Sequence, residues 1–87
     1  MALCYVLVKT KSHAFHLESR FRQEGVQCEL INMPRDIMSD LCTLGIRFTE
    51  ADLAAALDVI GRCRLPGCKV FREVWSGGIL YEEVYAE

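Results

Sequence analysis

Residues 26–48 read VQCELINMPRDIMSDLCTLGIRF and decide the fold, because they hold two neighbouring strands with no helix between them. Apolar residues alternate with polar or small ones over residues 26–30 and again over residues 44–48, which is the period of a half-buried strand. Pro34 ends the first strand, because its ring removes a backbone donor and keeps Met33 extended. Residues 34–43 are therefore predicted to form a loop that is irregular or briefly helical.

A helix is predicted on each side of this pair of strands. Ser12 has the residue type of a helix N-cap, and apolar residues at helical spacing follow it as far as Gly25, a typical helix stop. Thr49 is predicted to cap the second helix, with Asp52 three residues later in a variant of the capping box. The apolar stripe of this helix continues to Gly61, which ends or loosens it.

Strands near both ends of the chain complete the pattern. Residues 2–8 are almost continuously apolar, and residues 68–75 follow a Pro-Gly turn. The resulting order predicts an α+β fold, a ferredoxin-like split βαβ plait with a four-stranded antiparallel sheet and two helices on one face. A turn at residues 76–78 allows residues 79–85 to pair back as a C-terminal hairpin extension. Residues 1–87 form a single domain in this interpretation.

Length and composition limit the classes of function. A chain of 87 residues has room for one hydrophobic core, and its 52% hydrophobic and 25% charged residues suit a globular domain. The net charge of −2 gives no global field that favours nucleic acid or anionic membranes. The apolar run in residues 3–8 is too short to cross a bilayer. We therefore expect neither a nucleic-acid nor a membrane partner.

The cysteine count indicates a reducing compartment. Five cysteines cannot all pair within one chain, and no secretory signal precedes the first strand, so we expect reduced thiols and a cytoplasmic protein. Most of the thiols should pack as small hydrophobic side chains. His13 with His16, or Cys63 with Cys68, would be an incomplete set of zinc ligands, and no further ligand lies at a telling spacing. No metal and no cofactor are predicted.

Cys42 is the candidate reactive residue, because it lies in the predicted loop with Arg35 and Arg47 at the two ends. The thiolate is the reactive form of cysteine, and guanidinium groups or helix-terminal amides stabilise it. Ser39 could cap a short turn that presents such amides to Cys42. In the ordinary alternative, Cys42 is a buried loop residue and the arginines pair with the loop aspartates. No base or cofactor motif accompanies the cysteine, which argues against a turnover enzyme.

Three motifs in this chain resemble those of one protein family. They are Ser12-His13-Ala14 at the first helix start, Pro34-Arg35-Asp36-Ile37, and Ser39 and Cys42 ahead of the strand exit Ile46-Arg47-Phe48. This pattern resembles the bacterial family of small selenium/sulfur carrier-like proteins, although Thr43 stands where that family usually has glycine. The resemblance implies that Cys42 matches the family's cysteine, and Pro34 and Arg35 its Pro-Arg pair.

The function that the resemblance implies is transfer rather than turnover. Cys42 would accept a sulfur or selenium atom as a persulfide or its selenium analogue and hand it to a partner enzyme by thiol exchange. Arg35 and Arg47 would stabilise the anionic terminal atom, and Ser39 would donate a hydrogen bond to it. The implied partners are donor and acceptor proteins. Apolar residues near the C-terminus, such as Trp75, also suggest a homodimer.

The alternative hypothesis is a non-catalytic binding or assembly module for a small anion or a protein partner. Two lysines precede Ser12 and His13 at a helix N-terminus, where amides and the helix dipole attract anions, and Arg35 would complete such a site. A solvated helix start accounts for the same residues. Ligand-dependent thermal stabilisation that survives the loss of Cys42 would distinguish a binding module from a carrier.

Overall fold

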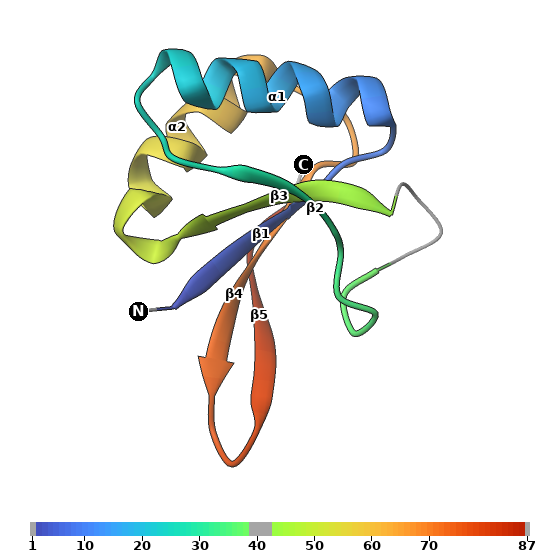
Figure 1. Cartoon of the computed structure of the whole chain (residues 1–87), viewed down its shortest axis with the longest axis vertical. Helices are drawn as coiled ribbons and strands as arrows, with labels where there is room; N and C mark the ends of the chain where they lie inside the picture. The colour runs from blue at the N-terminus through green and yellow to red at the C-terminus, as the bar shows by residue number, and fades with distance from the viewer. Residues whose placement is uncertain (1, 39–42, 87) are drawn as a thin grey trace.

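The computed structural model describes residues 2–38 and 43–86. The elements in these ranges are β1 (Leu3–Leu7), α1 (Lys11–Gln23), β2 (Glu29–Asn32), β3 (Leu44–Thr49), the 3-10 turn η1 (Glu50–Asp52), α2 (Leu53–Cys63), β4 (Lys69–Trp75) and β5 (Ile79–Ala86). The strands form one antiparallel sheet in the order β2-β3-β1-β4-β5. Both helices lie over the same face of this sheet (Figure 1). The predicted α+β class is confirmed, and no helix within the described ranges is long and apolar enough to cross a bilayer.

The described part of the sheet has five strands rather than the predicted four, because the predicted C-terminal hairpin extension forms and joins the sheet. β5 pairs with β4 from the Trp75–Ile79 pair to the Lys69–Ala86 pair, and therefore belongs to the sheet as its edge strand. The turn between them contains Gly77 at φ 69°, in the left-handed region that glycine adopts without steric cost. In Figure 1 the far end of this hairpin extends beyond the other strands.

The cap of α1 is Thr10 rather than Ser12, which lies inside the helix. The Thr10 backbone is extended, at φ −137° and ψ 160°, and its Oγ1 accepts a hydrogen bond from the backbone N–H of His13 at 3.1 Å. This is the usual geometry of a threonine N-cap. The prediction erred by two residues because Thr10 and Ser12 are both capping residue types and the apolar spacing does not choose between them.

The second helix also begins and ends differently from the prediction. Thr49 precedes η1, but its side chain makes no capping hydrogen bond, so the predicted capping box is wrong. α2 runs past Gly61 to Cys63, and Arg64 after it adopts the left-handed conformation at φ 52° that often ends a helix. Gly61 is exposed, and a Cβ there would meet nothing within 4 Å, so this glycine neither packs nor stops the helix.

The main core fills the space between the helices and one face of the sheet. Phe21 of α1 packs edge to face against Phe48 of β3, with ring centroids 5.8 Å apart. The buried side chains of this core are Cys4, Val6, Val8, Ala14, Leu17, Phe21, Val26, Cys28, Ile46, Phe48, Ala56, Val59, Ile60, Cys68 and Val70. Since alternate residues of a strand face the same side, the intervening residues of β1 point away from the helices.

A second cluster covers part of the opposite sheet face. Its buried members are Tyr5, Leu7, Met33 and Ile37, with Leu3, Ile31, Phe71 and Tyr81 packed around them. Met33 and Ile37 come from the chain that follows β2, so this segment folds back over the sheet. Both faces of β1 are therefore covered, in agreement with its nearly continuous apolar sequence.

Candidate functional site

The loop between β2 and β3 has a fixed base. The backbone N–H of Met33 donates to the carbonyl oxygen of Thr43 at 2.7 Å, which joins the two ends of the loop. After Pro34 the chain makes a turn, in which the N–H groups of Ile37 and Met38 donate to the Pro34 carbonyl at 3.2 and 3.1 Å. Met33 and Ile37 are buried in the second cluster, and they anchor the first half of the loop.

The structure describes some of the predicted loop residues and not others. Cys42 and Ser39 lie outside the described residues, so the predictions for them stay predictions. Pro34 is half-buried at the start of the turn, and Arg35 is exposed within it. None of the ion pairs found among the described residues includes Arg35.

The start of α1 lies at the same end of the sheet as this loop. β1 and β3 are antiparallel, with Val6 opposite Ile46, so the end of β1 that leads into α1 adjoins the beginning of β3. Figure 1 shows α1 and β3 both beginning on that side. Ser12 is exposed, while Nδ1 of His13 is buried and has no hydrogen-bond partner among the residues described. Buried polar atoms are normally paired, so a nitrogen without a partner among the described residues is an unusual feature of this helix start.

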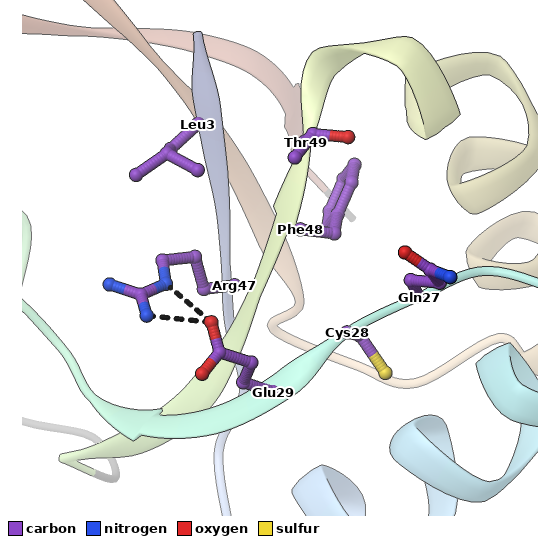
Figure 2. A pocket seen from close by; sticks show the side chains of 7 residues that line it. All are labelled: Leu3, Gln27, Cys28, Glu29, Arg47, Phe48 and Thr49. Atoms are coloured by element: carbon purple, nitrogen blue, oxygen red, sulfur yellow. Dashed lines mark hydrogen bonds and ion pairs between the residues drawn. The ribbon is translucent and has the colours of Figure 1, made fainter. Parts of the chain in front are cut away.

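Arg47 is already engaged by another residue. Its Nε and Nη2 donate to Oε1 of Glu29 at 3.1 and 2.6 Å, across the β2–β3 pair (Figure 2). This hydrogen bond raises the pKa of Arg47 further. Arg47 lies on β3, three residues beyond Leu44 where the strand begins. Arg47 therefore pairs with Glu29, a glutamate of β2. Neither Arg35 nor Arg47 pairs with Asp36.

A pocket lies beside this ion pair, where β2 separates from β3. The predicted strand began at Val26, but β2 begins at Glu29, so the preceding residues do not pair with the end of β3. The pocket is lined by Leu3, Gln27, Cys28, Glu29, Arg47, Phe48 and Thr49 (Figure 2). The sequence analysis missed this pocket, because alternation over residues 26–30 gives no sign of where strand pairing starts.

The cysteines within the described ranges are mostly enclosed. Cys4, Cys28 and Cys68 are buried, and Cys63 is half-buried near the end of α2. Burial raises the pKa of Cys4 to about 11 and also raises that of Cys28. Their thiols therefore stay protonated and unreactive at neutral pH. In the described residues no group of three or more His, Cys, Asp or Glu side chains could hold a metal ion.

The raised pKa of Cys4 predicts a loss of stability at alkaline pH. In the unfolded chain the Cys4 thiol ionises near pH 9, whereas in the folded chain it holds its proton to about pH 11. The unfolded state therefore binds fewer protons in this window, and the free energy of unfolding should fall by about 2–3 kcal/mol as pH rises through it. Urea denaturation at a series of pH values measures this fall.

A Cys4→Ala variant is the control for this titration. It should show a shallower fall over the same window, with Cys28, Tyr5 and Tyr81, whose pKa values are also raised by burial, contributing to the remaining slope. An unchanged slope in Cys4→Ala would contradict the assignment to Cys4.

These features define a class of protein before any comparison. It is a small α+β protein in which the segment between two neighbouring strands contains a cysteine, and in which a buried histidine nitrogen at a helix start has no partner in residues 2–38 and 43–86. The family model described as "Putative Se/S carrier protein-like" matches residues 3–85. The chain therefore belongs to this family, which confirms the resemblance noted from its motifs. No curated protein and no solved structure matches the chain.

Membership in the family supports the general kind of function that the motifs implied. The family description names carriers of selenium or sulfur, and a carrier must interact with the proteins that load and unload it. The ligand, the transfer chemistry and the identity of those proteins are treated below as proposals.

Proposed function

We propose that this protein carries a sulfur or selenium atom on Cys42 and delivers it to a partner enzyme. The observation that carries the proposal is the family match over residues 3–85, a range that includes Cys42. The surroundings of the other cysteines support it, because Cys4, Cys28 and Cys68 are buried and Cys63 is half-buried. A carrier thiol must be reached by two different proteins, which a buried thiol cannot be.

The proposed loading and delivery steps are two thiol exchanges. The Cys42 thiolate attacks the outer sulfur of a donor persulfide, the donor's S–S bond breaks, and the donor cysteine leaves as a thiolate. The atom is then held as a Cys42 persulfide, or as the corresponding S–Se species for selenium. In delivery, the acceptor's nucleophile attacks the outer atom and Cys42 leaves as a thiolate. Neither step needs an external oxidant or reductant.

The proposed ligand-binding residues have distinct roles. The exposed guanidinium of Arg35 stabilises the anionic outer atom, and Ser39 donates a hydrogen bond to it. Pro34 supports them because its carbonyl accepts the two hydrogen bonds that hold the turn. Arg47 adds only a positive potential from β3, since its donors already bind Glu29.

The helix start forms the second half of the proposed site. The buried Nδ1 of His13 lacks a described partner and supplies a polar contact at the end of the sheet where the loop begins and ends. Ser12, exposed in the first turn of α1, supplies a hydroxyl. We further propose that the fold is a ferredoxin-like plait extended by β5, and that the protein works in the reducing cytoplasm, where Cys42 stays a free thiol between transfers.

The test is whether a sulfur donor loads sulfur onto the protein. We expect that incubation with a cysteine desulfurase and cysteine adds one sulfur atom to the intact mass, and that peptide mapping places it on Cys42. Cys42→Ala should show no added sulfur, because the other thiols are enclosed. Cys63→Ala is the matched control and should load as the natural protein does. Added sulfur that persists in Cys42→Ala would refute the carrier assignment.

A further inference from the structure

The sheet face opposite the helices holds a buried carboxylate, Glu73 of β4. Only 9% of Glu73 is exposed. The hydroxyl of Tyr5 donates to its Oε2 at 3.3 Å, and the indole N–H of Trp75 donates to its Oε1 at 3.0 Å. Tyr81 lies directly opposite Glu73 on β5, and its ring packs edge to face on Tyr5 with centroids 5.7 Å apart.

This carboxylate is hydrogen-bonded but lacks a cation. The ion pairs of the described residues do not include Glu73, and Arg47, on the same face, is held by Glu29. Neutral donors offset only part of the cost of burying an ionised carboxylate, and a positive partner offsets more. Burial and the Glu73 carboxylate raise the pKa of Tyr5, so Tyr5 remains a protonated donor. Arg47 and Glu73 interact electrostatically, but the Arg47 guanidinium is hydrogen-bonded to Glu29, so no described cation pairs directly with Glu73.

The surrounding side chains suit a cation. The faces of tryptophan and tyrosine rings carry partial negative charge and attract ammonium and guanidinium groups, with tryptophan the strongest. Trp75 is 68% exposed although its indole N–H is bound to Glu73, so much of its ring remains accessible to a ligand. We propose that Glu73, Trp75, Tyr5 and Tyr81 form a docking site for an arginine or lysine side chain of a partner protein.

Two observations favour a side chain of a protein over a free small cation. Ile79 is directly paired with Trp75, is 41% exposed and provides apolar area next to the carboxylate, which a protein surface can cover. The segment containing Ile37 packs on the same face and leads toward Cys42. A partner seated at Glu73 would therefore lie near the turn that contains Ile37, which precedes Cys42 in the sequence. The partner's identity as donor or acceptor rests on the proposed function, but the binding of a cationic side chain does not.

The single tryptophan of the chain provides a direct readout, because Trp75 is itself part of the site. The probe is the peptide acetyl-Leu-Arg-Leu-amide, compared with the same peptide containing citrulline, the neutral analogue of arginine. Tryptophan fluorescence and the indole N–H signal in NMR follow each titration of the natural protein and of Cys42→Ala. We expect the arginine peptide to bind about fivefold tighter than the citrulline peptide in both proteins.

The variants assign this preference to the site. Glu73→Gln should abolish the difference between the two peptides, whereas Glu83→Gln should keep it, because it makes the same charge change at an exposed position of β5. Tyr81→Leu keeps apolar bulk but removes a ring, and should reduce the preference about threefold. It also tests the site if Glu73→Gln does not fold.

Three results would overturn the proposal. One is equal binding of the two peptides to the natural protein. Another is a preference for arginine that survives both Glu73→Gln and Tyr81→Leu. The third is a concentration-dependent dimer in analytical ultracentrifugation that protects the Trp75 indole, because the occupant would then be a second copy of this chain. A preference that is intact in Cys42→Ala while sulfur loading fails in the natural protein would refute the carrier function and leave the docking site standing.

Discussion

Replacing Phe21 by alanine should lower the free energy of unfolding by about 3–5 kcal/mol. Phe21 is completely buried where α1 meets the sheet, and its ring packs on Phe48. Truncation removes this packing and leaves a cavity between α1 and β3, which the surrounding structure can fill only in part. Domains of this size have a total stability of about 5–15 kcal/mol, so the variant should be close to unfolding at 37 °C. Urea denaturation followed by circular dichroism measures the change.

Phe15→Ala is the matched control on the same helix. Phe15 is 52% exposed, so its truncation should change the free energy of unfolding by no more than about 0.5 kcal/mol. Equal losses in the two variants would contradict the packing described for α1, since the difference between them depends on which face of the helix is turned to the sheet.

Replacing Gly45 by alanine should also destabilise the fold strongly, by about 3 kcal/mol. A Cβ at this position in β3 would collide with the backbone carbonyl oxygen of Val6 in β1 and lie 2.6 Å from Cε of Met33. The Met33 side chain can move, but the Val6 carbonyl belongs to the central strand and cannot shift without disturbing the pairing of β1 and β3. Chemical denaturation gives the loss in stability.

The Gly45 variant has a second expected effect, on loading. Met33 anchors the base of the loop, so its displacement should slow sulfur transfer to Cys42 under conditions in which the variant is still folded. Gly61→Ala is the control, because a Cβ there, in the last turn of α2, meets nothing within 4 Å. It should raise stability by about 0.5–1 kcal/mol and leave loading unchanged. A neutral Gly45→Ala would show that the strands are not as closely spaced as described.

The spacing of hydrophobic residues along the sequence predicted the helices and strands that bury one face. The stripe that includes Ala14, Leu17 and Phe21 reports which side of α1 meets the sheet, and those side chains are buried. The same holds for the alternation of Ile46 and Phe48 in β3. Period is a local property, so it indicates helices and strands wherever burial is one-sided.

Features that depend on pairing between distant residues could not be predicted in this way. The turn at residues 76–78 predicted the pairing of β5 with β4, because a hairpin is a local feature, but it gave no sign of the register shift between Val70 and Phe71. Glu29 binds Arg47 only because the register of β2 and β3 places them opposite each other. Glu73 has a residue type that is typical of exposed positions, and it is buried by contact with Tyr5, 68 residues earlier.

The candidate site also contains residues that could be predicted from the sequence and residues that could not. Pro34 and Arg35 stand out in the sequence because a proline changes the backbone locally and a basic residue follows it directly in the predicted loop. The unpaired nitrogen of His13 does not stand out, because its burial depends on how α1 lies on the sheet. A histidine near a helix start is usually solvated, and only the packing distinguishes this one.

The hydrogen bond between Met33 and Thr43 closes the base of the loop between β2 and β3. Strand register and core packing are set mainly outside this loop, so its exposed described residues Arg35, Asp36 and Met38 can be exchanged with little thermodynamic penalty, whereas the buried Ile37 cannot. Under the proposed carrier function, changes at these exposed positions would alter chalcogen preference independently of folding. Grafting the corresponding segment from another member of the family should transfer its cargo preference while the melting temperature stays nearly constant.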